Sequence, residues 1–247
     1  MKFFKNLRMG IWMYWDLIHI HSNKKNIHKY RAQGDLESER KEIAIAESTW
    51  GKNLIRKVGV KVHVEGLENI PQGAVVFVAN HQSYADIAVL TSVIDFKQIG
   101  FIAKEDLRKL PVFGEWIYDV RSVFIKREDP RASLRAIEKG TEYLKQGFSL
   151  GIFPEGTRSK GGKMGEFKRG SLRLATKPGI PVVPITIDGS YKCFEEKGYA
   201  FPAEVHVFIH SAIETKDMDK KEASELSERV KEMIEDKLQN LQANKNG

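Results

Sequence analysis

Apolar and polar positions follow two strand-like patterns soon after residue 60. Residues 60–66, "VKVHVEG", alternate apolar and polar side chains, which predicts a half-buried strand. Residues 74–80, "AVVFVAN", stay apolar up to the last position, which predicts a central strand covered on both faces. The two patterns together predict a sheet whose centre is buried.

Similar runs continue along the chain and alternate with helical segments. Further strands are predicted at residues 99–104, 122–127, 149–159 (running into a polar loop), 180–187 and 203–210. Helices are predicted at residues 84–93, 107–120, 129–145 and 222–241, with a short one before residue 180. Strands that alternate with helices predict an α/β fold, here a mixed, largely parallel sheet flanked by helices.

The first twenty residues have an apolar stripe at helical spacing. Its members are Phe4, Leu7, Ile11, Trp15 and Ile18. Asp16 and His19 interrupt the segment, which lacks the roughly 20 unbroken apolar residues of a spanning helix. Aromatic side chains and flanking lysines suit a boundary between water and anionic lipid, so we interpret the segment as an interfacial helix. Packing of the stripe on the protein's own core is the alternative.

A second helix is predicted at residues 35–57. Its stripe consists of Leu36, Ile43, Trp50 and Leu54. Residues 23–34 are interpreted as the turn between the two helices. The chain is therefore predicted to have a two-helix, membrane-associating amphipathic hairpin at residues 1–57 and an α/β domain at residues 58–247.

Composition favours anionic partners. The 247 residues have a formal net charge of +7, which suits nucleic acid, anionic lipid or phosphorylated substrates. Nucleic acid ranks last because no zinc finger or RNP-type strand is present. Cys193 is the only cysteine, so neither a disulfide framework nor a multi-cysteine zinc site is possible within the chain.

The stretch "NHQSYAD" follows the predicted central strand and contains His81 and Asp86. The two side chains meet only if His81 lies in the loop and Asp86 on the first helical turn. The carboxylate would then orient the imidazole, which would act as a general base. For the spacing alone, a turn-capping histidine and a solvated aspartate remain the simpler interpretation. A metal site and Ser83 as a nucleophile are weaker alternatives, and Ser83 is predicted to be the helix N-cap.

A second candidate stretch is "FPEGTRS" at residues 153–159. Arg158 has a planar charge suited to phosphate oxygens. Glu155 is expected either to accept a hydroxyl of the substrate or to position Arg158. A surface turn with an incidental ion pair is the alternative for this stretch alone.

Both stretches together resemble the glycerolipid acyltransferases with a His-x4-Asp motif. Within that family the chain is most similar to the 1-acylglycerol-3-phosphate acyltransferases, which make phosphatidic acid. The resemblance covers roughly residues 60–210 and includes "AKEDLRKLPVFG" at residues 103–114, "FIKR" at 124–127 and "VVPI" at 182–185. One departure is Arg121, which stands where the family often has glycine.

The resemblance implies a role for each matching residue. His81 is the base and Asp86 orients it. The predicted contacts with the acceptor's glycerol phosphate are Lys104, Arg127, Glu155, Gly156 and Arg158. The implied acceptor is lysophosphatidic acid, and the implied donor is an acyl thioester of coenzyme A or acyl carrier protein.

The implied protein is a peripheral or monotopic enzyme on the cytoplasmic side of the cell membrane, with no metal or redox cofactor. Two alternatives from other classes remain open at this point. One is a membrane lipid-binding protein without catalysis, and the other is a thioesterase in which water replaces the alcohol.

Overall fold

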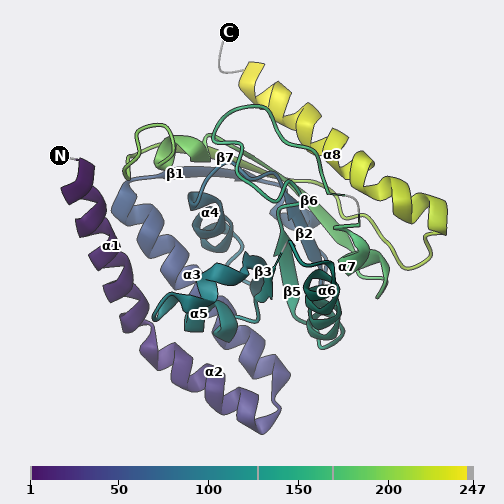
Figure 1. Ribbon diagram of the computed structural model, residues 1–247, viewed down its shortest axis with the longest axis horizontal. Coiled ribbons are helices and arrows are strands. Elements are labelled where there is room, and N and C mark those ends of the chain that lie inside the picture. Colours follow the sequence, from purple (N-terminus) through teal and green to yellow (C-terminus); the bar gives the residue numbers. More distant parts are fainter. Residues whose placement is uncertain (1, 127, 169, 244–247) are drawn as a thin grey trace.

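The protein is built around one seven-stranded sheet (Figure 1). A computed structural model describes residues 2–126, 128–168 and 170–243. The strand order across the sheet is β1-β7-β6-β2-β5-β3-β4. The strands are β1 (Lys61–Glu65), β2 (Val76–Ala79), β3 (Ile99–Lys104), β4 (Val123–Ile125), β5 (Ser149–Ile152), β6 (Val182–Asp188) and β7 (Glu204–Ile209).

Five neighbouring strands, from β6 to β4, are parallel to one another. Strand β7 runs antiparallel to β6, and β1 is parallel to β7. The predicted mixed, largely parallel sheet is therefore confirmed. The carboxyl ends of the five parallel strands meet at one edge, where the loops of such sheets bind ligands.

Eight α-helices and three 3-10 turns are present among the described residues. The α-helices are α1 (Lys2–His19), α2 (His21–Gln33), α3 (Leu36–Val58), α4 (Ala85–Val93), α5 (Phe113–Asp119), α6 (Pro130–Lys145), α7 (Arg173–Thr176) and α8 (Lys220–Ala243). The 3-10 turns are η1 (Leu67–Asn69), η2 (Glu105–Lys109) and η3 (Ser190–Cys193). Asp129 caps α6 as predicted, since its carboxylate accepts the N–H groups of Arg131 and Ala132.

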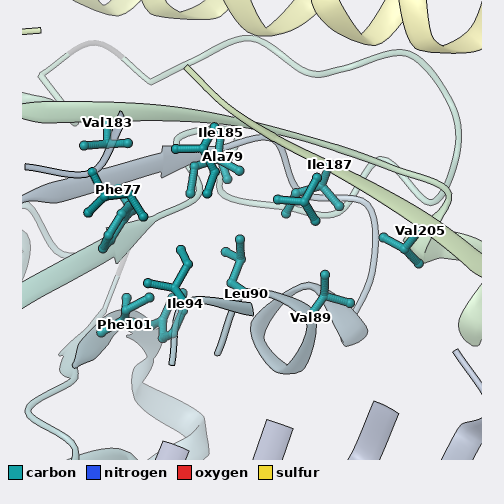
Figure 2. Close-up of a cluster of buried hydrophobic side chains, with 14 of the residues drawn as sticks. Phe77, Ala79, Val89, Leu90, Ile94, Phe101, Val183, Ile185, Ile187 and Val205 are labelled. Atoms are coloured by element: carbon teal, nitrogen blue, oxygen red, sulfur yellow. The ribbon is translucent and has the colours of Figure 1, made fainter. Parts of the chain in front are cut away.

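Helix α4 covers one face of the sheet. Val89 and Leu90 of this helix, and Ile94 directly after its end, point toward Phe77 of β2 and Ile185 of β6 (Figure 2). All five side chains are almost completely buried. Burial of a large aliphatic or aromatic side chain stabilises the fold by about 1.5–3 kcal/mol, so this layer fixes the start of α4 at the carboxyl end of β2.

The opposite face of the sheet is covered mainly by α8, with α6 and α7 beside it (Figure 1). Val230 and Ile234 of α8 pack in one cluster with Val78 of β2 and Leu150 of β5. Because both faces of β2 and β6 are covered, every residue of these two strands is buried. The motif "VVPI" lies within β6 and is thus part of the buried centre.

The turn predicted at residues 23–34 is wrong, because nearly all of this segment belongs to α2. The sequence from residue 21 to 33 contains no glycine or proline, and Ile27 is fully buried. The chain reverses instead at Gly34, which has a φ of 69°, and at Asp35, whose carboxylate accepts the N–H of Ser38. In Figure 1, α1 and α2 form one arm of the hairpin and α3 forms the returning arm.

Helix α3 is joined to the rest of the protein by a buried charge cluster. Glu39 has no exposed side-chain surface and accepts two hydrogen bonds from Arg121, at 2.7 and 2.8 Å, and one from Arg31. Arg121 has a φ of 61°, a left-handed conformation that favours glycine. The bidentate contact with Glu39 holds the side chain of Arg121 in place despite this backbone conformation.

Among residues 2–126, 128–168 and 170–243, no helix combines the length and the apolar character that crossing a bilayer requires.

Candidate active site

His81 and Asp86 meet as the sequence predicts. His81 follows the end of β2 in a loop, and Asp86 lies on the first turn of α4. Their contact joins His81 Nδ1 to Asp86 Oδ2 at 2.8 Å. The loop is held in place by Asn80, whose side-chain amide exchanges two hydrogen bonds with the backbone of Ile187 in β6.

The carboxylate of Asp86 is fully buried and organises the loop around it. Oδ2 accepts the backbone N–H groups of Gln82 and Ser83 in addition to the imidazole. Oδ1 is buried and has no hydrogen-bond partner among the described residues. A buried acceptor without a partner costs free energy, and such groups deserve a functional explanation in a native fold.

The imidazole of His81 is fixed on one face as well as at Nδ1. Its ring stacks on Phe153 with a centroid distance of 4.1 Å and an interplanar angle of 19°. The side chain keeps 19% of its surface exposed. Because Nδ1 is bonded to the carboxylate, Nε2 is the nitrogen available to a substrate hydroxyl.

Ser83 lies in the same loop, but its contacts are those of a structural residue. Its hydroxyl donates to Glu195 at 2.6 Å and accepts the N–H of Ala85. The N-cap position of α4 is Tyr84, so the prediction of Ser83 as N-cap is wrong by one residue.

The "FPEGTRS" loop approaches His81 through Glu155. One carboxylate oxygen accepts the N–H of His81 at 2.6 Å, and the other accepts the N–H of Gly165 at 2.7 Å. Burial raises the pKa of Glu155, and the two N–H groups oppose this shift. The alternative in which Glu155 positions Arg158 is wrong, because the ion-pair partner of Arg158 is Glu195. The contact predicted between Glu155 and the acceptor stays a prediction.

Gly156 and Arg158 lie on the open side of this loop. Gly156 has a φ of 70°, a left-handed backbone conformation that favours glycine over residues with a side chain. The guanidinium of Arg158 lies 3.4 Å from the ring centroid of Tyr84 and bonds Glu195 Oε1 through Nη1 at 2.7 Å. The guanidinium of Arg158 is therefore held on one face by the ring of Tyr84 and at one edge by the carboxylate of Glu195.

Lys104 and Arg127 are the two remaining residues predicted to contact the acceptor. Lys104, the last residue of β3, forms an ion pair with Asp106 at 2.6 Å and is 55% exposed. Arg127 lies outside the described residues, so its predicted contact with the acceptor has no structural account.

A cavity of about 860 Å³ connects these side chains with the interior. His81, Lys104, Gly156 and Arg158 line it, whereas Glu155 is not among the described residues that do. Apolar side chains of α3, α5 and α6, such as Trp50 and Trp116, line much of the remainder together with residues of α4 and β3. The cavity extends from Lys104, at one end of β3, to Glu47. The carboxyl group of Glu47 accepts the N–H of Ile99, at the other end of the strand. Five steps of about 3.3 Å along the strand correspond to a span of about 16 Å.

The model of the Acyltransferase family matches residues 61–188. The chain belongs to this family. A solved structure, the 1-acyl-sn-glycerophosphate acyltransferase of Thermotoga maritima, is 31% identical and has a TM-score of 0.74, with 98% of each chain covered. The high coverage includes the N-terminal helices as well as the sheet.

Two curated relatives of this acyltransferase have similar names. The 1-acyl-sn-glycerol-3-phosphate acyltransferase of Pseudomonas aeruginosa is 33% identical over 183 residues, which cover 73% of this chain and 70% of the relative. A chloroplast enzyme of that name from Arabidopsis thaliana is 40% identical over 158 residues. That match spans 62% of this chain and only 44% of the chloroplast protein.

Two buried carboxyl groups of this acyltransferase have no motif that points to them. Glu195 contacts both the His81 loop and Arg158. Glu47 lines the far end of the cavity, and burial raises its pKa well above 4.5, opposed only by the hydrogen bond from Ile99 N–H. A protonated Glu47 suits an apolar cavity, because a carboxylic acid costs far less to bury than a carboxylate.

Glu47→Gln is expected to stabilise the protein at high pH. A carboxyl group with a raised folded pKa takes up a proton on folding, so its contribution is favourable below the unfolded pKa and is lost as pH rises toward the folded one. Glutamine keeps an acceptor for Ile99 N–H and does not titrate. The melting temperature of Glu47→Gln should exceed that of wild type at about pH 8, and the gap should shrink toward about pH 4. Exposed Glu68→Gln is the control; a gap independent of pH would contradict a raised pKa.

Proposed function

We propose that the protein transfers a fatty acyl group from an acyl thioester to the 2-hydroxyl of lysophosphatidic acid, giving phosphatidic acid. The observation that carries the proposal is the 2.8 Å contact between His81 Nδ1 and the buried Asp86, at the mouth of a long apolar cavity beside Arg158. Relatives with the corresponding names support the choice of substrate.

The reaction needs one base and no protein nucleophile. His81 Nε2 takes the proton of the 2-hydroxyl while the hydroxyl oxygen attacks the thioester carbonyl carbon. The tetrahedral intermediate collapses with cleavage of the carbon–sulfur bond. The imidazolium, stabilised by Asp86, returns the proton to the departing thiolate, so the products are an ester and a free thiol.

Binding would divide between the polar mouth and the apolar interior. The phosphate of the acceptor lies against Arg158 and Lys104, because both line the cavity near His81. A fatty acyl chain enters the apolar part toward Glu47. The acyl donor is a thioester of coenzyme A or of acyl carrier protein.

The N-terminal arm would dock the enzyme on the cytoplasmic surface of the cell membrane. The five side chains of the α1 stripe are 48–68% exposed. The alternative in which this stripe packs on the protein's own core is therefore wrong. An exposed apolar stripe beside lysines is suited to one leaflet of an anionic bilayer, and it would bring the cavity to substrates that reside there.

A thioester assay with and without lysophosphatidic acid tests the proposal. Release of free thiol should require the acceptor and should match the phosphatidic acid formed. Release without acceptor would identify a thioesterase, and binding of lysolipid without thiol release would identify a lipid-binding protein.

Arg158→Ala is expected to impair use of the phosphorylated acceptor selectively. Loss of a hydrogen bond to a charged group typically costs about 1.5–3 kcal/mol, so kcat/KM for lysophosphatidic acid should fall on the order of 10- to 100-fold. A monoacylglycerol without phosphate should be affected much less. The exposed Lys163→Ala serves as control. Equal proportional losses on the two acceptors would show that Arg158 does not recognise phosphate.

A further inference from the structure

Glu195 is an acidic residue buried between the two loops of the site. It follows η3, and its carboxyl group is only 3% exposed. Oε2 accepts the hydroxyl of Ser83 at 2.6 Å, while Oε1 accepts the N–H of Tyr84 at 3.0 Å and the Nη1 of Arg158 at 2.7 Å. A charged group so far from water must be compensated by hydrogen bonds and an opposite charge, and Glu195 has both.

The three contacts connect parts of the site that lie far apart in the sequence. Ser83 and Tyr84 stand between His81 and Asp86, so one side of the carboxylate holds the loop that carries the base. Arg158 belongs to the loop after β5. Glu195 thus links the base loop to the arginine loop, in addition to the direct hydrogen bonds of His81 with Glu155 and Ser159.

The guanidinium of Arg158 is well suited to serve two anions. It has five N–H donors in a planar fork. Contact with Glu195 uses the Nη1 edge, and the ring of Tyr84 covers one face. The other edge can then present parallel donors to a phosphate group, and little side-chain conformational entropy is lost on binding because the rotamer of Arg158 is already fixed. A lysine, with a single point charge on a flexible stem, would not divide its donors in this way.

We propose that Glu195 is a positioning residue, which orients Arg158 toward the acceptor's phosphate and holds the His81 loop through Ser83 and Tyr84. The inference rests on the proposed function, since it takes lysophosphatidic acid as the acceptor. Orientation and charge act in opposite directions here. Orientation of Arg158 by Glu195 lowers the KM for the acceptor, whereas the negative charge of Glu195 repels the phosphate and raises that KM. A rise or a fall of the KM in a variant without the charge therefore shows which effect is larger.

Glu195→Gln tests the contact with Arg158. The amide has nearly the same shape and keeps an acceptor for Tyr84 N–H and a partner for the Ser83 hydroxyl, but it loses the charge. The KM for lysophosphatidic acid is expected to rise about 10-fold, the size typical of losing a charge-assisted hydrogen bond, with a much smaller change in kcat. The KM for a monoacylglycerol should stay unchanged. Glu196→Gln, at the exposed neighbouring position, should behave as wild type.

Two further variants extend the test, and the second does not contain Glu195→Gln, so it stays decisive if that substitution impairs folding. In the Arg158→Ala background, adding Glu195→Gln should raise the acceptor KM no further, because the two changes remove one interaction. Ser83→Ala removes the contact on the other side, and it should lower kcat while the KM for lysophosphatidic acid stays near that of wild type. Melting temperatures of all variants separate kinetic effects from instability.

The inference and the proposed function fail in different ways. If the wild-type protein forms no phosphatidic acid, the proposed function is wrong. If wild type is active and Glu195→Gln has an unchanged or lower KM for lysophosphatidic acid, Glu195 does not orient Arg158. Multiplicative effects of Glu195→Gln and Arg158→Ala on KM, or an effect of Ser83→Ala on KM alone, would also overturn the inference.

Discussion

His81→Ala is expected to abolish acyl transfer while the fold remains intact. The imidazole is the base in the proposed reaction, and Asp86 fixes its orientation through Nδ1 at 2.8 Å. Removal of a general base typically costs 10²–10⁴-fold in rate, so kcat should fall by about this factor. No step passes through a serine nucleophile, and the Ser83 hydroxyl is committed to Glu195 and the N–H of Ala85.

The fold should tolerate this change for a specific reason. Asp86 Oδ2 keeps the N–H groups of Gln82 and Ser83 after the imidazole is lost, so the buried carboxylate is not left without partners. Purified His81→Ala protein should therefore have a melting temperature close to that of wild type and should still bind lysophosphatidic acid. His63→Ala, an exposed histidine on β1, is the matched control. Turnover of His81→Ala within a few-fold of wild type would rule out the mechanism.

The elements of the α/β domain could be predicted because their patterns are local. The alternating run at residues 60–66 and the apolar run at 74–80 became β1 and β2 with nearly the expected bounds. The contact of His81 with Asp86 could also be predicted from the sequence, because the five-residue spacing is set by one loop and one helical turn. Such features depend only on neighbours along the chain.

The partner of Arg158 could not be predicted in the same way. Glu195 lies 37 residues from Arg158 and 112 residues from Ser83 in the sequence. It stands in the stretch "FEEKG", where Glu196 has the same chemistry and no spacing distinguishes the two. Only the tertiary fold shows which of them points into the site.

Residues 23–34 illustrate a different limit. Asparagine and lysine made this segment resemble a polar turn, yet it forms α2 because α3 and α5 provide partners for it. Asn23 and Asn26 both donate to Glu42 of α3, and Lys24 forms ion pairs with α5. Tertiary contacts therefore outweigh a weak local preference.

Replacing the outer face of α1 by serine is expected to release the protein from membranes. Phe4, Ile11 and Trp15 are 60–68% exposed. Polar contacts join the other side of the helix to the body of the protein: Asn6 donates to Gly198 O, and Asn53 donates to Asp16. A helix that turns its polar groups inward and its aromatic rings outward gains no free energy from burial of those rings as long as they stay in water. Its rings match the boundary between headgroups and acyl chains of a bilayer.

The triple variant Phe4→Ser, Ile11→Ser and Trp15→Ser removes three of the five side chains of the α1 stripe. Each side chain contributes about 1.5 kcal/mol or more on leaving water, so binding to vesicles should weaken roughly 10³-fold. The fold should persist, because the buried residues of the arm, such as Leu17 and Ile20, are unchanged. Flotation with vesicles of anionic lipid measures the binding, and salt should weaken the electrostatic part of it.

A matched variant separates the α1 stripe from general surface hydrophobicity. Phe96→Ser removes an aromatic ring that is 58% exposed in the loop between α4 and β3 and does not belong to the α1 stripe. It should float with vesicles as wild type does. Activity of the triple variant should fall far more on acceptor held in a bilayer than on acceptor dispersed in detergent, because only the first requires docking. If the triple variant floats as well as wild type, α1 is not the anchor, and its exposed stripe needs another partner.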